Sequence, residues 1–207
     1  MNISRTCIGC KYMSPLFAFL KEKELALVDR NKFTVLFKKG ETIRKQGTAM
    51  THVVSVNSGL AKLYLEGAGM RNAIIRIVRP TNFIGGPGIY LDTMHHFSIT
   101  ALQDSVVCFI DIMAFKKIID SNKAFSREFM KDFSRNILSV YSRLISLTEK
   151  QTAGRLADSL LYLFNEIFEG SSIPRDITKK DIADLSSMSK ESAVQGLRQF
   201  QKDGIIV

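Results

Sequence analysis

Three cysteines are the residues of this sequence whose type and spacing point most directly to chemistry. Cys7 and Cys10 form a C-x2-C motif, and Cys108 lies far along the chain in the segment DSVVCFID. Thiolates at this spacing can share one metal ion or one edge of an iron–sulfur cluster, so the three cysteines are candidate ligands of zinc or of such a cluster. In the alternative interpretation Cys108, which alternates with Val106 and Ile110, is a small core residue. Cys7 and Cys10 are then exposed thiols.

A second group of candidate ligands is the histidine pair His95 and His96, which lies between Met94 and Phe97. Imidazole nitrogens bind haem iron and other metals. Neighbouring residues of a strand point to opposite faces, however, which disfavours a shared metal. We therefore favour the interpretation of these histidines as separate core or surface side chains.

The C-terminal segment carries a different chemistry, the recognition of base edges. Thr178 followed by Asp181 is typical of a capping box at the start of one helix, and Ser189 can cap a second helix after the interruption at Ser186-Ser187-Met188. The outer face of this second helix carries polar side chains that suit hydrogen bonding in a major groove: Lys190, Glu191, Gln195 and Arg198. The alternative is an ordinary helical hairpin with a solvated face.

A long amphipathic helix is expected before this segment. Apolar residues recur there at alternating spacings of three and four: Met130, Phe133, Ile137, Val140, Leu144 and Leu147. This heptad pattern is typical of a helix that pairs with its own copy, so we predict a homodimer with these six residues in the interface. The alternative is a monomer whose helix packs on its own sheet domain, with Phe129 and Tyr141 placed to contribute.

The secondary-structure elements that must position these residues can be predicted from the local composition of the chain. Residues 32–115 contain short β-branched and aromatic runs between glycines, which predicts strands at 33–37, 52–56, 60–65, 73–78, 96–102 and 106–112. Asn57-Ser58-Gly59 is expected to be a hairpin loop. We predict an α+β fold: an antiparallel β-roll or jelly roll sensor domain (residues 1–123), a dimerisation helix (124–150) and a helix-turn-helix domain (151–207) that includes a further helix at 155–168.

Composition narrows the possible classes of function. The 207 residues are 45% hydrophobic, but no apolar run reaches the roughly 20 residues that a membrane helix needs. The odd number of cysteines argues against a disulfide framework, and the N-terminus has no signal-peptide pattern. We therefore expect a cytoplasmic protein without a membrane partner. No nucleophile–base pair and no pair of carboxylates indicates an enzyme.

The net charge of +9 would suit a nucleic-acid partner. Residues 1–125 contain 17 basic and 9 acidic side chains, whereas residues 126–207 contain 12 and 11. Because the basic excess lies outside the candidate helix-turn-helix, the overall charge is only weak support for DNA binding.

The order of sheet domain, long helix and helix-turn-helix resembles the Crp/Fnr superfamily of bacterial transcription regulators. The resemblance extends from about Leu16 to Val207 and rests on these segments: KKGETIRKQG (38–47) with NSGLAKLY after it, PTNFIGGPG (80–88), ITALQDSVVCFID (99–111), TAGRLADSLLYL (152–163) and SKES (189–192). It implies a one-component, homodimeric regulator that senses a ligand and binds a palindromic site on double-stranded DNA. RNA polymerase is a further partner that the resemblance implies.

The resemblance also implies an effector pocket, formed here by Gly85, Gly86, His95, His96 and Phe97. In the members that respond to cyclic AMP, a glutamate holds the ribose and an arginine–serine pair clamps the phosphate. The matching positions here hold Gly86 and His96-Phe97, which removes both groups. We therefore predict that the effector is not cyclic AMP. It is either a neutral or apolar molecule, or the protein has no effector.

Resemblance to the fumarate-nitrate branch of the superfamily implies a role for the cysteines as ligands of an iron–sulfur cluster. Its members hold a [4Fe–4S] cluster with N-terminal cysteines and one central cysteine, and Cys108 falls where that central ligand would be. That branch uses four cysteines and this sequence has three, so a fourth ligand would have to be His, Asp or solvent. A redox or metal sensor that uses Cys7, Cys10 and Cys108 is thus an alternative function.

The resemblance assigns DNA-reading roles along the second helix, residues 189–201. Relatives read DNA with the pattern Arg-Glu-Thr-x-x-Arg, which is matched here by Lys190, Glu191, Ser192 and Gln195. Lys190 suits guanine and Glu191 a cytosine amino group, whereas Gln195 suits adenine. Contacts to DNA phosphates are expected from four other residues: Lys179, Lys180, Ser189 and Lys202.

The last residues, from Gly204 to Val207, resemble the opening strand of the wing that follows the recognition helix in relatives. We therefore expect a winged helix-turn-helix with a truncated wing. The missing wing and the nearly neutral C-terminal part suggest one more alternative, a ligand-binding module that does not read DNA.

Overall fold

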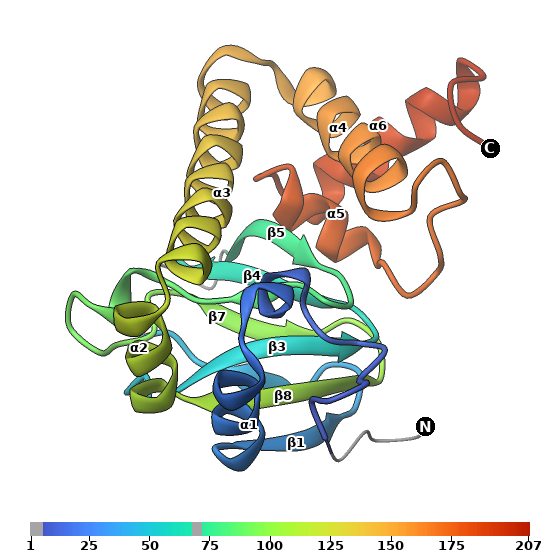
Figure 1. The fold of residues 1–207 in the computed structure, drawn as a ribbon. Coiled ribbons are helices and arrows are strands. Elements are labelled where there is room, and N and C mark those ends of the chain that lie inside the picture. Colours follow the sequence, from blue (N-terminus) through green and yellow to red (C-terminus); the bar gives the residue numbers. More distant parts are fainter. Residues whose placement is uncertain (1–5, 68–71) are drawn as a thin grey trace. The chain divides into compact units, whose positions relative to one another are not determined.

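The computed structural model describes residues 6–67 and 72–207. The described part of the chain contains these strands: β1 (Lys32–Phe37), β2 (Thr42–Arg44), β3 (His52–Ser58), β4 (Ala61–Glu66), β5 (Asn72–Val78), β6 (Phe83–Ile84), β7 (Ser98–Ala101) and β8 (Ser105–Asp111). The helices are η1 (Pro15–Phe19), α1 (Glu22–Arg30), η3 (Pro87–Ile89), α2 (Ile112–Ser121), α3 (Lys123–Glu149), α4 (Thr152–Leu161), the π-helical η4 (Tyr162–Ile167), α5 (Lys179–Leu185) and α6 (Lys190–Lys202). The predicted α+β fold is confirmed, with the strands ahead of the long helix and the C-terminal helices (Figure 1). The helices η1 and α1, which precede β1, were not predicted.

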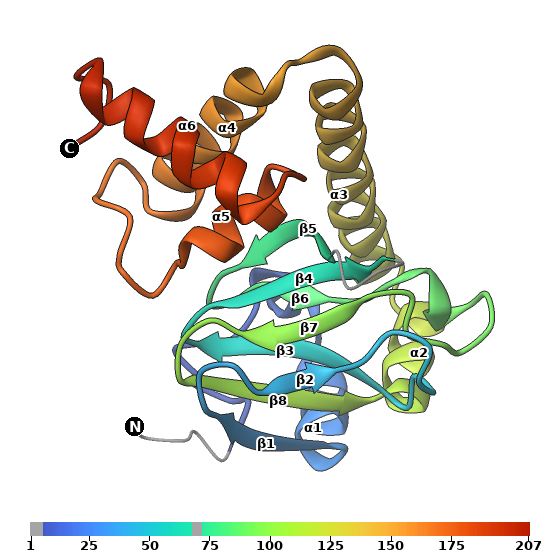
Figure 2. The same cartoon turned by 180° about the vertical axis from the view of Figure 1, so that it is seen from behind.

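The strands form two four-stranded sheets, with the orders β1-β8-β3-β6 and β2-β7-β4-β5 (Figure 2). In the first sheet β8 lies between β1 and β3 and pairs antiparallel with both. Its residues are almost all buried, because side chains of both faces are covered. This explains why the segment SVVCFID reads as a continuous apolar run rather than as an alternating one.

The expected hairpin at Asn57-Ser58-Gly59 is wrong. β3 and β4 flank this segment but belong to different sheets, so the chain crosses from one sheet to the other here. Gly59 has a φ of +83°, and a Cβ at this position would lie 2.4 Å from Oγ of Ser105 and 2.5 Å from the carbonyl oxygen of Asp104. Glycine is therefore needed both for the backbone conformation and for the close approach to the start of β8.

Helices cover the outer face of the first sheet. Figure 1 shows α1 and α2 beside β1, β8 and β3. A cluster of phenylalanines joins η1, β6, α2 and the start of α3 in one core: Phe17, Phe83, Phe115, Phe125 and Phe129. The rings of Phe83 and Phe115 are stacked with their centroids 4.9 Å apart. The first turns of α3 are thus anchored in the sheet domain by Phe125 and Phe129.

Beyond these anchors α3 exposes apolar side chains. Met130, Val140 and Leu144 of the predicted seam are exposed, and Phe133, Ile137 and Leu147 are half-buried. Phe129 is buried, as the alternative monomer interpretation expected, but Tyr141 is exposed. Three of the six residues of the predicted seam are therefore exposed in the single chain, and the other three are only half-buried.

The chain divides into two compact units, Met1–Leu63 with Val78–Ile137 and Tyr64–Ile77 with Leu138–Val207. The division falls inside β4 and α3 and not at the ends of α3. The predicted domain limits 1–123, 124–150 and 151–207 therefore stay predictions. In the described part of the chain, the helices are too short or too polar to cross a membrane.

The helix-turn-helix forms as predicted from its caps. The Thr178 side chain accepts a hydrogen bond from the amide of Asp181, whose carboxylate in turn accepts from the Thr178 amide. Ser189 accepts from the amide of Ser192 and so begins α6. Ile182, Ala183 and Leu185 are buried on the inner side of α5. Each of these features follows from residue types at fixed spacing, which is why the sequence predicts them.

Candidate functional site

The second helix of the helix-turn-helix, α6, is held with its polar face outward. Ala193 is completely buried, and a Cβ at Gly196 would lie 2.5 Å from Cδ2 of Leu156 on α4. These two small residues let α6 lie close against α4, and they fix which side of α6 faces the interior. The opposite side is free to meet a partner.

The residues predicted to read bases lie together on that outer side. Lys190, Glu191, Gln195 and Arg198 are all exposed. Hydrogen bonds to its own backbone amide and to the Ser189 side chain lower the pKa of Glu191, so this carboxylate is ionised at neutral pH. An ionised carboxylate can accept a hydrogen bond but cannot donate one, which matches the expected contact to a cytosine amino group.

Ser192 is placed differently from its neighbours. It is only half exposed, and its hydroxyl accepts a hydrogen bond from the hydroxyl of Ser189 at 3.0 Å. The two serines thus hold each other at the start of α6. Their role in capping is visible in the structure, whereas their contacts to DNA stay predictions.

The residues predicted to contact phosphates are all exposed, but they are not equivalent. Lys179 and Lys202 extend from the first turn of α5 and the last turn of α6. Lys180 forms an ion pair with Asp184, with Nζ and Oδ1 2.5 Å apart, and the Asp184 side chain is only 5% exposed. This ion pair was not predicted, although the spacing of four residues between opposite charges could have indicated it.

The predicted effector pocket is partly filled by its own side chains. A Cβ at Gly86 would lie 3.1 Å from the ring of Phe97, and one at Gly85 would lie 2.9 Å from Cδ1 of Ile89. A side chain at position 86, where the sequence resemblance implies a glutamate in the relatives that respond to cyclic AMP, would require the Phe97 ring to shift by a few tenths of an ångström. The position where those relatives place an arginine carries His96, which lies 3.1 Å from a carboxylate oxygen of Asp92.

The two histidines of this region lie in different environments. His95 is 3% exposed, and both of its ring nitrogens are without a hydrogen-bond partner among residues 6–67 and 72–207. Burial, together with the nearby charge of Arg44, lowers the pKa of His95 to about 4, so the ring is neutral at pH 7. His96 is half exposed. The two side chains therefore lie in separate environments, as expected for neighbouring residues whose side chains point to opposite faces.

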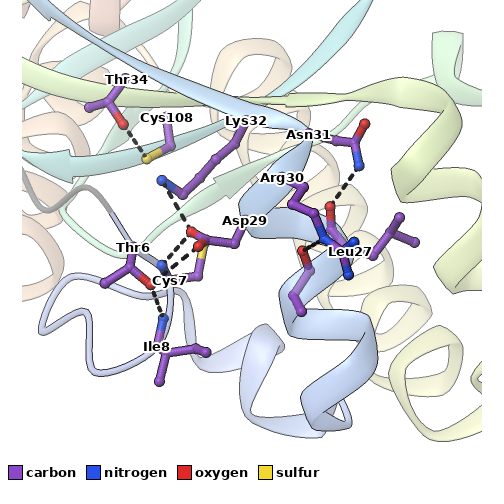
Figure 3. Close-up of polar contacts among 11 residues, drawn as sticks. Thr6, Cys7, Ile8, Leu27, Asp29, Arg30, Asn31, Lys32, Thr34 and Cys108 are labelled. Atoms are coloured by element: carbon purple, nitrogen blue, oxygen red, sulfur yellow. Dashed lines mark hydrogen bonds and ion pairs between the residues drawn. The ribbon is translucent and has the colours of Figure 1, made fainter.

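The three cysteines come together, which the sequence alone did not establish. Cys7, Cys10 and Cys108 line one small pocket of about 20 Å³. The amide of Cys7 donates to Oδ1 of Asp29 at 2.7 Å, and the hydroxyl of Thr34 lies 3.2 Å from Sγ of Cys108 (Figure 3). The interpretation of Cys7 as an exposed thiol is wrong, because its side chain packs in the core beside α1.

A buried lysine lies beside these cysteines and was not anticipated. The Lys32 side chain is 6% exposed and its Nζ lies 3.5 Å from Oδ1 of Asp29 (Figure 3). Burial raises the pKa of Cys7 to about 12 in spite of the nearby Lys32 charge, so the thiol is protonated.

This arrangement does not fit the cofactors that the cysteines suggested. The pocket has room for about one water molecule, far less than an iron–sulfur cluster needs. Across the described ranges 6–67 and 72–207, no three His, Cys, Asp or Glu side chains form a group suited to a metal ion. The three cysteines, as they lie here, therefore do not fit an iron–sulfur cluster or a zinc ion.

Comparisons with known proteins agree with this geometry. Residues 34–122 match the family model of the cyclic nucleotide-binding domain, and residues 154–207 match that of the Crp-like helix-turn-helix domain. The electron transport regulator A of Shewanella oneidensis is 26% identical over 81% of this chain and 68% of its own. The CRP-like cAMP-activated global transcriptional regulator of Mycobacterium tuberculosis is 22% identical over 92% of this chain and 87% of its own.

Among solved structures, the c-di-GMP responsive global regulator CLP of Xanthomonas campestris superposes with a TM-score of 0.75. It covers 89% of this chain and 93% of its own, at 15% identity. At this identity the likeness concerns the fold alone.

Proposed function

Because the chain belongs to the Crp/Fnr superfamily of transcription regulators, we propose that it acts as a homodimer, reads a palindromic DNA site and responds to an effector other than cyclic AMP. The relatives are transcription regulators and not enzymes. RNA polymerase is then a further partner, as for a regulator that acts at promoters.

The observation that carries the DNA-reading role is the orientation of α6. Ala193 and Gly196 fix its inner side against α4, so Lys190, Glu191 and Gln195 project from the helix-turn-helix. An exposed first turn followed by a polar helix face is the geometry that enters a major groove. Helix α6 spans thirteen residues, enough to lie along the groove across one half-site.

Dimerisation is supported by the uncovered stripe on α3. Met130, Val140 and Leu144 are exposed in the single chain, and they recur at the spacing of a two-stranded coiled coil. A second copy of the same helix would bury this stripe along its length and would present two α6 helices related by a two-fold axis. Two-fold symmetry in the protein implies a palindromic site with half-sites about one helical turn apart.

A different effector is supported by the filled pocket. Phe97 occupies the space beside Gly86, and His96 is paired with Asp92 where an arginine would clamp a phosphate. The ribose acceptor and the phosphate clamp are therefore both replaced. The sensor domain then responds to a chemically different molecule.

The test is to incubate the purified full-length protein with fragments of its own genome and to sequence the DNA that it retains. We expect a shared palindrome whose half-sites are about one helical turn apart. In the Gln195→Arg variant, the preferred base at one symmetric pair of positions should change from adenine to guanine. Gln201→Arg makes the same change in charge near the exposed end of α6 and should raise affinity without altering the preferred base.

The proposal fails if the retained fragments share no sequence and the protein binds all DNA equally in a salt-sensitive way. In that case the helix-turn-helix would bind only phosphates, and the ligand-binding module without DNA readout would be the better interpretation. Adding cyclic AMP at millimolar concentration should leave the retained set unchanged. A new palindrome that depends on cyclic AMP would refute the effector part alone.

A further inference from the structure

A polar cavity lies within the second compact unit, at a distance in sequence from the predicted effector pocket. It has a volume of about 290 Å³, the size of a small metabolite, and is lined by residues of α3, α4, η4 and α5 together with Ile75 of β5. All of its lining residues fall within Tyr64–Ile77 or Leu138–Val207, so the cavity belongs to one compact unit. None of the DNA-binding residues predicted above lines it.

The first charged group of the cavity is Arg143 of α3. Its guanidinium donates a hydrogen bond to the backbone carbonyl of Leu185 at the end of α5. Burial lowers the pKa of Arg143 to about 10, which reflects the loss of water around the cation. Among residues 6–67 and 72–207 it forms no ion pair with a carboxylate, so most of its donors are left for another acceptor.

Two further donors in the cavity wall lack partners. The Nε atom of Arg155 on α4 is buried without a hydrogen bond to any described residue. Ser186, which follows α5, is 1% exposed, and its hydroxyl is likewise without a partner in the described part of the chain. Buried donors without acceptors are costly, and a serine hydroxyl can reach a new acceptor by rotation about a single bond.

The acidic residues of the cavity do not neutralise these groups. Asp158 accepts a hydrogen bond from Ser146 at 2.6 Å and forms an ion pair with Lys150 at 2.8 Å, so its charge is already compensated. Glu166 is exposed at the rim. The walls therefore present two guanidiniums and the Ser186 hydroxyl as donors for a further acceptor, whereas the hydroxyls of Ser142, Ser146 and Ser159 already donate within the described part of the chain.

We propose that this cavity binds a small oxyanion, a phosphate or carboxylate group of a small molecule, between Arg143 of α3 and Arg155 of α4. Planar guanidiniums hold such groups through paired hydrogen bonds. The ligand would also approach Ser186, and it would thereby join the C-terminal half of α3 to the end of α5. The binding itself is independent of the proposed reading of DNA.

The test measures the melting temperature of the full-length protein in increasing potassium phosphate, against potassium chloride of equal ionic strength. We expect a saturable rise that is specific to phosphate, because a ligand stabilises the folded state to which it binds. Potassium acetate in a parallel series distinguishes a carboxylate site from a phosphate site. A response to acetate and none to phosphate would assign the cavity to carboxylates.

Two variants locate the binding. Arg155→Met should weaken phosphate binding by at least about tenfold, since it removes charged donors. Asn165→Asp at the exposed rim adds a negative charge without altering the core, and it should weaken binding by about tenfold as well. Gln201→Glu on α6 makes the same change in charge outside the cavity and should have no such effect.

The proposal is overturned if neither phosphate nor acetate acts differently from chloride, or if Asn165→Asp responds as the wild type does. Phosphate could also bind to the DNA-facing cations, which the variant Lys190→Gln tests. Loss of the response in Lys190→Gln, with its retention in Arg155→Met, would place the anion on the DNA-binding face. That outcome would refute this proposal and leave the proposed function intact.

Discussion

Lys179 and Lys180 are neighbours with the same charge, and the structure predicts different consequences when each is replaced by glutamine. Lys179 is exposed and forms no ion pair with residues 6–67 or 72–207. Lys180 is held by the carboxylate of Asp184 at 2.5 Å. Free lysines release counterions when they meet a phosphate, whereas a lysine already paired contributes less.

The magnitudes follow from these environments. In a dimer, Lys179→Gln removes one phosphate contact from each half-site, so the slope of log K against log salt should become shallower by about 1.8. Lys180→Gln should change that slope by less than half as much. It leaves Asp184 buried and unpaired, and since the lysine end is 52% exposed we expect a loss of stability on the order of 1–2 kcal/mol.

Two measurements separate the variants. Fluorescence anisotropy with a labelled duplex of arbitrary sequence, at a series of salt concentrations, gives the slopes without knowledge of the target site. Urea unfolding gives the free energies of unfolding. The assigned difference between the two lysines is refuted if both variants change the slope equally and Lys180→Gln unfolds at the urea concentration of the wild type.

Three further predictions concern the sheet crossing, the dimer seam and the buried histidine. Gly59→Ala should cost at least about 2 kcal/mol of unfolding free energy, because its Cβ would meet backbone atoms, whereas Gly40→Ala, with φ +87° and open space around it, should cost about 1 kcal/mol in urea unfolding. Leu144→Glu should turn the proposed dimer into a monomer in sedimentation experiments, whereas Ile145→Glu, which is about equally exposed but lies outside the seam, should leave it a dimer. If both variants remain dimeric, the predicted seam is not the dimer interface. Since the pKa of His95 is about 4 when folded and 6.5 in the unfolded chain, the unfolded state binds the proton first. Stability should therefore fall between pH 6.5 and 4, by at most about 1.4 kcal/mol per pH unit, and His95→Leu should flatten this dependence in urea unfolding.

The sequence predicts those features that depend on spacing within a single element. The capping box of Thr178 and Asp181, the cap at Ser189 and the apolar repeat of α3 are all local patterns, and the structure contains each of them. The six predicted strands also lie within a few residues of observed ones, whereas the short strands β2 and β6 were not predicted. Local rules suffice here because caps and periodicity act between residues that are close along the chain.

Features that depend on distant residues were not predictable in the same way. Asn57-Ser58-Gly59 has the composition of a hairpin loop, but the partner of each strand is chosen by the packing of two sheets. The alternative of Cys7 as an exposed thiol was wrong, because nothing in its own segment indicates that it packs beside α1. The cavity between Arg143 and Arg155 is formed by helices whose mutual packing no single segment encodes.

The candidate DNA-binding face depends partly on residues that are close along the chain and partly on distant ones. The outward direction of Gln195 follows from its immediate neighbour, because Gly196 must lie against Leu156 and leaves no space for a side chain on that side. The sequence therefore contains both the reading residue and the small residue that orients it, at a spacing that a helix fixes. What it does not contain is the distance between the two copies of α6 in the proposed homodimer, which would depend on how two α3 helices pair. The proposed chemistry of each half-site therefore depends on local residue order, whereas the proposed spacing of about one helical turn depends on the pairing of two distant α3 helices.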